Sequence, residues 1–352
     1  MKRTISIVLI LCMLLSSAIF FSGCSAIEKG KDWPVTVGDA TIGKEPQSIV
    51  VLNDVFADII SAIGYDIKMV GRSEECNQDF LYIVPVVGTA ADPDVNTIAS
   101  LKADVVLADH SLNSDAKAKL ESNGAVVVTL DVPGNEDELK NLYISLGTAL
   151  GGKETGSTKG EKGYDSHMDL LSKMNTATSN VVQTVAYLYM NENNQLCTFV
   201  QGTLPYKFFN YNGNTNVFSN QKEPVVNLEE LRLGSPNYIF YDSEAVLTAL
   251  KADQTLAHLH ALTNNGTFLI PRKSFERYGA SAEEAVFKML SFIEKDTKAT
   301  PDQATAAPNA ANGHAAPAAT QAAAPAATQA PAAPQNDENV ITYSAQDAPA
   351  AE

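Results

Sequence analysis

Short apolar runs alternate with amphipathic segments over residues 33–152. The runs are rich in β-branched residues, which favours strands, and the segments between them repeat apolar residues at three- and four-residue steps, which favours helices. The expected strands are residues 48–52, 68–71, 84–88, 104–108 and 125–130, with an edge strand at 33–37. One helix is expected to begin directly after Asn53. Further helices are expected at residues 96–101, 114–122 and 137–150. This alternation predicts a mainly parallel sheet covered on both faces, which is one α/β lobe.

The same alternation returns over residues 176–296 and predicts a second α/β lobe. Its expected strands are residues 184–190, 197–200, 238–241 and 267–270, and its expected helices are residues 204–211, 228–233, 244–251 and 282–294. A weak internal repeat relates the two halves, because residues 96–108 and 227–241 both run from a polar residue through a short helix and a turn to an apolar strand. The repeat fits two related lobes, and it also fits features common to all α/β proteins.

Residues 153–175 lie between the two lobes and contain neither Pro nor a strand-like apolar run. Apolar side chains recur there at three- and four-residue steps, at Tyr164, Met168, Leu171 and Met174. This spacing predicts a single helix that connects the lobes. Gly156, Gly160 and Gly163 oppose it, because each Gly costs a helix about 1 kcal/mol relative to Ala. The helix is therefore expected to begin near Ser166 or to be held in place by the lobes; a surface helix within one domain is the alternative.

The N-terminal residues have the layout of an export signal. Two basic residues precede an apolar run at residues 5–21, and a small pair follows before Cys24. The sequence FSGC at residues 21–24 resembles the cleavage site of bacterial lipoproteins. It implies a signal peptide at residues 1–23, a lipid on Cys24 and a linker at 24–32. An uncleaved anchor is the alternative, and both place the body of the protein outside the cytoplasm.

The C-terminal residues differ in composition from the rest of the chain. Residues 297–334 consist almost entirely of Ala, Pro, Thr and Gln. They cannot bury enough apolar surface to offset the entropy lost on ordering. We therefore expect a disordered tail over residues 297–352.

Charge and cysteine usage narrow the range of partners. The formal net charge is -16 at pH 7, which argues against nucleic acid and against an anionic lipid surface as the main partner. Contact with the membrane is expected through the N-terminal lipid instead. Of the four Cys, Cys12 lies in the signal and Cys24 is the lipid site, so Cys76 and Cys197 remain as lone thiols without a disulfide framework.

Several stretches of the chain resemble one family. They are residues 47–52 (QSIVVL), 69–72 (MVGR), 86–88 (VVG), 98–108 (IASLKADVVLA), 227–231 (NLEEL) and 235–240 (SPNYIF). In order and spacing they resemble the substrate-binding proteins that serve ABC importers of cobalamin, haem and ferric siderophores. The resemblance covers about residues 33–294.

The resemblance implies an α/β fold of two Rossmann-like lobes bridged by a single long helix, as in class III periplasmic binding proteins. The lobes would be residues 33–152 and 176–296, joined by the helix at 153–175, with the ligand held in the cleft between them and little hinge motion. It further implies a monomer that is lipid-anchored to the bacterial cell membrane and works with ABC permease and ATPase subunits. No resident cofactor or metal site is expected, since any metal belongs to the chelate ligand.

Topology locates the cleft independently, because ligands of open α/β sheets lie beyond the carboxyl ends of the strands. The residues expected there are Asn53, Asp54, Arg72, Thr89, His110, Gln201, Tyr241 and Arg272, with Tyr206 and Phe275 on neighbouring loops. Aromatic walls with a few polar groups suit a large, flat or ring-shaped chelate. Arg72 and Arg272 are expected to pair with carboxylates of such a ligand. For each residue alone, an ordinary place in a loop or on the surface is the alternative.

The resemblance also implies two sites of contact with the permease. The family uses one acidic residue on each lobe, which docks on Arg of the permease. Glu229 falls on the second-lobe position. Glu74 lies a few residues before the first-lobe position and is the candidate there. The alternative for both is a solvated surface carboxylate.

The sequence leaves the class of chelate open. Cobalamin binders often place Trp in the cleft, but the single Trp here is Trp33, near the N-terminus. The candidate haem-iron ligands are limited to His110, Tyr206 and Tyr241.

Other functions make different demands on the sequence. A hydrolase or nucleotide-binding enzyme would need a motif such as Gly-x-Ser-x-Gly, His-Glu-x-x-His or a P-loop, and the sequence has none of these, so we expect no enzyme. A receptor for free metal ions would need His spread over both lobes, whereas His258 and His260 are close neighbours and His167 lies on the connecting helix. A surface adhesion or wall-associated protein would explain the tail and predicts no small-molecule ligand.

Overall fold

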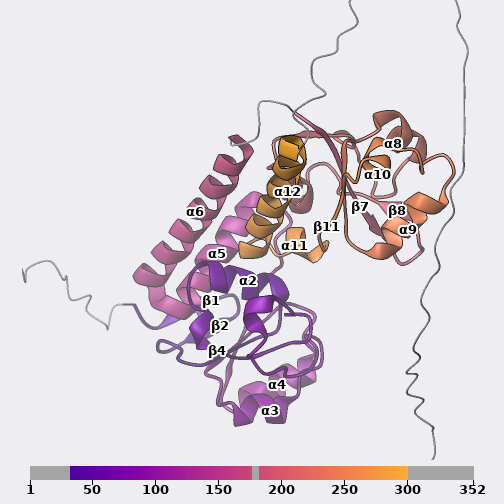
Figure 1. Cartoon of the computed structure of the whole chain (residues 1–352). Coiled ribbons are helices and arrows are strands. Elements are labelled where there is room, and N and C mark those ends of the chain that lie inside the picture. Colours follow the sequence, from indigo (N-terminus) through magenta and orange to yellow (C-terminus); the bar gives the residue numbers. More distant parts are fainter. Residues whose placement is uncertain (1–31, 177–181, 300–352) are drawn as a thin grey trace, which may run out of the picture. The chain divides into compact units, whose positions relative to one another are not determined.

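The computed structural model describes residues 32–176 and 182–299. Cys24, the expected signal and linker up to residue 31, and the expected tail from residue 300 onward lie outside the described residues. The described residues carry two main sheets, one in each half and each surrounded by helices, together with a small two-stranded sheet (Figure 1). Within these residues no helix is both long and apolar enough to cross a membrane.

Lobe 1 is built on a four-stranded, all-parallel sheet in the order β4–β3–β5–β6. The strands are β3 (Ile49–Val51), β4 (Met69–Arg72), β5 (Val105–Ala108) and β6 (Val126–Thr129). The expected edge strand near residue 35 does form, as β1 (Val35–Val37), but it pairs with β2 (Ala40–Ile42) in a separate antiparallel hairpin. The strand expected at residues 84–88 was wrong, since only isolated bridges form there. Pro85 lacks the N–H that a continuous ladder needs.

Helices cover both faces of this sheet, as the alternation predicts. They are α2 (Asp54–Ala62), α3 (Val95–Ser100), α4 (Ser114–Ser122) and α5 (Glu136–Gly151). Ile49 and Val51 of β3 belong to the core that includes α2 and α5, whereas Val50 faces the core with α3 and α4. Two-sided burial is what a continuous β-branched run in a parallel sheet requires.

Lobe 2 has a second sheet with a parallel centre, in the order β11–β10–β7–β8. Its strands are β7 (Thr184–Met190), β8 (Leu196–Cys197), β9 (Thr215–Asn216), β10 (Tyr238–Tyr241) and β11 (Thr267–Leu269). The strand expected at residues 197–200 is shorter and earlier, because β8 folds back antiparallel on the end of β7. The helices are α7 (Leu204–Asn210), α8 (Leu228–Gly234), α9 (Glu244–Ala252), α10 (His260–Thr263), α11 (Lys273–Glu276) and α12 (Ala280–Ala299).

A single long helix, α6 (Ser157–Thr176), bridges the lobes after a π-helical turn at Gly152–Gly156. It lies against α5 of lobe 1 and α12 of lobe 2 (Figure 1). Leu171 is buried on its inner face, as the apolar spacing predicts. Of the two expectations for this helix, a start near Ser166 was wrong, whereas support from the lobes that it touches is confirmed. A Cβ at Gly160 would collide with the carbonyl oxygen of Tyr143, so the glycines let α6 and α5 approach closely, and this packing offsets their low helix propensity.

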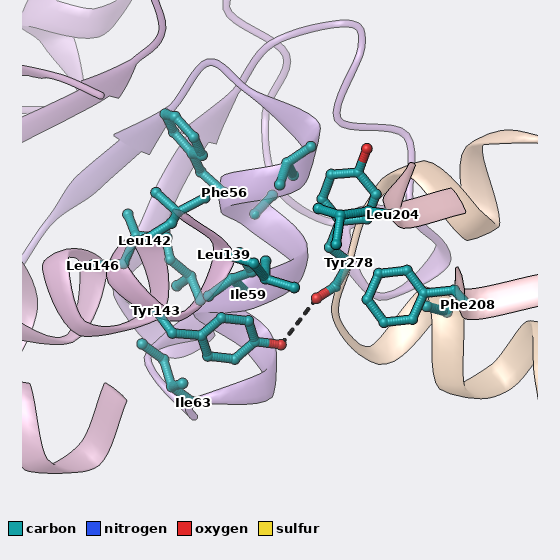
Figure 2. Close-up of a cluster of buried hydrophobic side chains, with 14 of the residues drawn as sticks. Phe56, Ile59, Ile63, Leu139, Leu142, Tyr143, Leu146, Leu204, Phe208 and Tyr278 are labelled. Carbon is teal, nitrogen blue, oxygen red and sulfur yellow. Dashed lines mark hydrogen bonds between the residues drawn. The ribbon is translucent and has the colours of Figure 1, made fainter. Parts of the chain in front are cut away.

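The two lobes share one apolar core where they meet. Phe56 and Ile59 of α2, Tyr143 of α5 and Phe208 of α7 belong to a single buried cluster. Figure 2 shows the Tyr143 hydroxyl donating a hydrogen bond to the carbonyl oxygen of Tyr278, at 3.0 Å. A core that is continuous across the joint opposes free hinge motion, because packed interiors do not deform without losing contacts.

Candidate functional site: the facing carboxyl edges of the two sheets

The carboxyl edge of the lobe 1 sheet meets lobe 2 at Asp54. The carboxylate Oδ2 of this residue lies 3.3 Å from Nζ of Lys273 and 3.4 Å from Nε of Arg277, both of which follow β11 in lobe 2. The Arg277 guanidinium also donates a hydrogen bond to the side chain of Asn77. The side chains of Asp54 and Arg277 are 8% and 9% exposed. Asp54, expected to face a ligand, is thus placed in an ionic contact between the lobes.

A second polar contact lies one helical turn further along α2. The backbone N–H and hydroxyl of Ser281 donate to the two carboxylate oxygens of Asp58, at 3.0 and 2.5 Å. Burial raises the pKa of the Asp58 carboxyl, and the hydrogen bonds from Ser281 oppose that rise. A Cβ at Gly279 would lie 2.7 Å from Asp58 Oδ2, so only glycine lets the chain pass this close. The floor between the lobes is therefore tightly packed.

The two arginines expected to bind carboxylates have different surroundings. Arg72 donates from Nε to the carbonyl oxygens of Leu81 and Val84, both at 3.1 Å, and from a terminal nitrogen to that of Cys76 at 2.9 Å. Its guanidinium thus organises the loop that follows β4. The Arg272 guanidinium lies over the ring of Tyr189, 4.7 Å from its centroid, and its side chain is 38% exposed. Of the two, Arg272 presents the more open surface.

Around the ends of β5 and β6 the surface is hollowed. A cavity of about 400 Å³ is lined there by Asp109, His110, Lys117 and Asp131, among others. The exposed His110 ring has Nε2 2.9 Å from Asp131 Oδ1. Asn53 caps α2 through its side-chain oxygen and donates from Nδ2 to Asp109 at 2.5 Å. His110 and Asn53 therefore lie at the same edge, as expected from the parallel strand order.

The expected residues on the remaining loops spread more widely. Thr89 is exposed and its Oγ1 accepts a hydrogen bond from the N–H of Asp92 at 3.1 Å. Gln201 is exposed beside α7. Tyr241 is buried, with its hydroxyl 3.2 Å from Glu244 Oε1. Phe275 is fully buried against Tyr187, Phe199 and Phe209, which places it in the aromatic core of lobe 2.

Residues of both lobes line a further pocket of about 430 Å³. Tyr206 lies there with its hydroxyl donating to the carbonyl oxygen of Ser219 at 2.8 Å. Sequence reasoning missed the other lining residues that matter most, which are Asn135 and Glu136 of lobe 1 and Lys207 and Tyr211 of lobe 2. Lys207 and Glu136 form an ion pair across the lobes. The strand order could have identified Asn135 and Glu136. They follow β6, whose carboxyl end lies on the same edge of the sheet as those of β3 and β5.

The two acids expected to dock on a permease are both exposed. Glu229 sits in the first turn of α8 and is bound by Arg232, with Nε 2.7 Å from Oε2. This hydrogen bond holds the pKa of Glu229 below its ordinary value. Glu74 follows β4 in the loop shaped by Arg72, and its backbone N–H donates to the carbonyl oxygen of Gly88 at 2.9 Å. Both carboxylates are thus available at the surface.

The fold is that of two α/β lobes joined by one long helix, with a pocket of about 430 Å³ lined by residues of both lobes. A family model described as periplasmic binding protein matches residues 49–273. The chain therefore belongs to the periplasmic binding protein family, a family of binding proteins rather than enzymes. Within the described residues, no group of three or more His, Cys, Asp or Glu lies close enough together to hold a metal ion.

Individual relatives agree with this membership. The chain is 25% identical over 305 residues to YvrC, an uncharacterised ABC transporter substrate-binding lipoprotein of Bacillus subtilis (strain 168), covering 81% of this chain and 96% of YvrC. It is 23% identical to YfmC, an Fe(3+)-citrate-binding protein of the same organism, covering 77% of this chain and 91% of YfmC. The crystal structure of the periplasmic heme-binding protein HutB of Vibrio cholerae superposes with a TM-score of 0.55 at 15% identity, covering 70% of this chain and 98% of HutB, which shows the shared fold.

Proposed function

We propose that this protein captures a metal chelate outside the cytoplasm and delivers it to an ABC importer. The observation that carries the proposal is the joint at Asp54, where the carboxyl edge of the parallel lobe 1 sheet is held against the segment that follows β11 of lobe 2 by Lys273 and Arg277. In open α/β sheets this edge is where ligands bind. The name of YfmC, an Fe(3+)-citrate-binding protein, supports an iron chelate as ligand. The proposal includes no catalytic step and no resident cofactor.

The chelate would contact the exposed groups along this edge. His110 lines the hollow at the end of β5, Tyr206 lines the pocket between the lobes, and Arg272 with Tyr189 forms a flat cation–π platform at the ends of β7 and β11. Flat or ring-shaped ligands bind well on such platforms, because stacking buries area without ordering a flexible side chain. Asn53, Asp54 and Arg72 would then shape the cleft through their own hydrogen bonds and ion pairs.

Delivery to the importer needs a membrane anchor and a docking surface. We infer that a lipid on Cys24 anchors the protein, as implied by residues 21–24, and that Glu229 and Glu74 dock on permease arginines. Both carboxylates are exposed, which supports this, because a guanidinium must reach both oxygens of a carboxylate to form a bidentate pair. The Arg232 side chain would have to release Glu229 on docking.

Calorimetric titration of the purified protein with cobalamin, haemin and a set of ferric siderophores tests the proposal. We expect one ligand class to bind with a Kd of about 1 μM or tighter, which is about -8 kcal/mol. The matched control is the metal-free siderophore, which should bind more weakly because it lacks the folded chelate shape. The absence of binding to every compound would contradict the proposal and favour a wall-associated adhesion role.

A further inference from the structure

We infer that the cleft is selective for charge: it takes an uncharged or cationic chelate and discriminates against polyanionic ones, including ferric citrate, the ligand in the name of YfmC. This inference rests on the proposed function and names the class of its ligand. It follows from the pairing of the charged side chains along the two carboxyl edges. A polyanion needs cations that are free to meet it, and it is repelled by carboxylates that have no cation beside them.

The cations near the cleft are already occupied. The Arg72 guanidinium donates to carbonyl oxygens of its own loop. Lys273 and Arg277 share the carboxylate of Asp54. Lys117 pairs with Asp39, 2.5 Å away, and Arg272 has Nε 3.1 Å from Glu276 Oε1. Each of these five basic side chains therefore has partners within the protein, although Lys273 and Arg277 share one carboxylate and the carbonyl groups around Arg72 do not cancel its charge.

The carboxylates of lobe 1 are not matched in this way. Glu74 and Glu75 follow β4, Asp109 follows β5, and Asp131 follows β6. Across the described residues, none of these four pairs with Lys or Arg, and Asp131 has only the ring of His110 beside it. Glu75 accepts the N–H of Ala90 at 3.0 Å. The carboxyl edge of lobe 1 is therefore net negative at neutral pH.

Asp109 and Asp131 also line the hollow of about 400 Å³ at this edge. Burial raises the pKa of Asp109, but hydrogen bonds from Ser111 and Asn53 outweigh it and hold that pKa below its ordinary value. The carboxylate is therefore ionised when a ligand arrives. Lys117, which also lines the hollow, is paired with Asp39, so Asp109 and Asp131 leave negative charge facing any group that enters.

Coulomb's law sets the size of the effect. A carboxylate about 10 Å from the centre of a trianion weakens its binding about fourfold at an ionic strength of about 0.01 M and about twofold at 0.15 M. Several such carboxylates multiply the effect. A monocation gains affinity from the same charges, and a neutral chelate is unaffected.

Three ferric complexes test the inference on the purified full-length protein. They are a linear trihydroxamate complex with a free amine (net +1), a cyclic trihydroxamate complex (net 0) and a triscatecholate complex (net -3). We expect either hydroxamate complex to bind more tightly than the triscatecholate. Raising the ionic strength from about 0.01 to 0.15 M should weaken the binding of the cationic complex and strengthen the binding of the trianionic one. Tighter binding of the trianion, or affinities independent of salt, would overturn the inference while leaving the proposed function intact.

The three complexes differ both in net charge and in the groups of the siderophore that bind iron. Variants of the protein separate these two effects. Glu74→Gln and Glu75→Gln should each raise the affinity for the trianion, by about fourfold at about 0.01 M ionic strength if the carboxylate lies about 10 Å from the ligand, and leave the neutral complex unchanged. Glu121→Gln is the control, because Glu121 is an exposed carboxylate near the end of α4, at the opposite edge of the sheet. Equal effects of all three substitutions would contradict a local origin. Failure of all three complexes, and of haemin and cobalamin as well, to bind counts against the proposed chelate receptor itself.

Discussion

The carboxylate of Asp58 on α2 is held by Ser281 at the start of α12, with the Ser281 hydroxyl 2.5 Å from Oδ1 and its N–H 3.0 Å from Oδ2. The two residues belong to different lobes and are separated by 223 positions in the chain. Asp58 is fully buried, so parting the lobes here would leave a carboxylate without donors in a dry interior. Together with the contacts of Asp54, this relationship holds the two lobes rigidly against each other.

Removal of the Ser281 hydroxyl should weaken this joint. Ser281→Ala is expected to lower the free energy of unfolding by about 1.5–3 kcal/mol, the usual range for a hydrogen bond to a charged group. Urea denaturation followed by circular dichroism measures the loss. Ser122→Ala is the matched control, because the exposed Ser122 hydroxyl only bonds a carbonyl of its own helix, and a change within about 0.5 kcal/mol is expected. Equal stability of the two variants would show that the hydrogen bond from the Ser281 hydroxyl to Asp58 contributes nothing.

Close packing of α6 on α5 gives a second prediction. Gly160→Ala should destabilise the protein by about 1–3 kcal/mol, because the new methyl group would overlap the carbonyl oxygen of Tyr143. Helix propensity alone predicts the opposite sign, a gain of about 1 kcal/mol. Thermal unfolding distinguishes the two. Gly43→Ala is the control, since nothing lies within 4 Å of a Cβ there.

Asp32 gives a prediction on pH. Its carboxylate accepts the N–H of Glu154 at 2.7 Å and the hydroxyl of Thr155 at 2.8 Å, and these bonds hold its pKa below the ordinary value of 3.8. A lowered folded-state pKa means that the ionised form stabilises the fold above pH 3.8 and that this contribution is lost as the pH falls through the folded-state pKa. Asp32→Asn should therefore reduce stability at pH 7, and the difference from the unmodified protein should shrink below pH 3.8. A difference that stays constant with pH would assign the effect to packing instead.

Docking on the permease is tested by separating binding from transport. Glu229→Gln should leave chelate affinity unchanged, because Glu229 lies on the exposed side of α8, and should reduce uptake about tenfold, the loss expected from one Arg–carboxylate pair of about 1.4 kcal/mol. Calorimetry and uptake of labelled chelate by cells measure the two quantities. Glu230→Gln, the neighbouring residue, is the control. Loss of chelate binding in Glu229→Gln would place that residue in the cleft.

The proposed lipid anchor on Cys24 is tested by removing the thiol that would carry it. Cys24→Ser should move the protein from the membrane fraction to the soluble extracytoplasmic fraction while leaving chelate binding unchanged. Fractionation followed by immunoblotting measures the shift. Retention of the variant in the membrane would favour an uncleaved N-terminal anchor.

Much of the fold could be predicted because its signals are local. The expected bounds agree within a residue or two with those of the strands β3 and β5 and of the helices α4 and α9. The errors occurred where another part of the chain overrides the local pattern. Pro85 interrupts a run that otherwise reads as a strand, and α6 begins at Ser157 because α5 accommodates its glycines.

The sequence predicts the location of the candidate site in the fold more reliably than the side chains that line it. The strand order brings Asn53 and His110 to one edge, as topology requires. The same rule includes the end of β6, yet Asn135 and Glu136 were missed there. It also cannot show that Phe275 turns into the aromatic core of lobe 2, since that depends on rings brought together from three other segments.

The sequence by itself determined the alternation of strands and helices, the two lobes and the family, because hydrophobic periodicity and motif spacing are properties of neighbouring residues. Only the tertiary structure decided which charges are free. Asp54 accepts a hydrogen bond from Arg277, which is 223 positions away in the chain, and the Arg72 guanidinium donates its hydrogen bonds to carbonyl oxygens of its own loop. Electrostatic pairing depends on distances of a few ångströms between remote segments, and such distances exist only once the chain has folded.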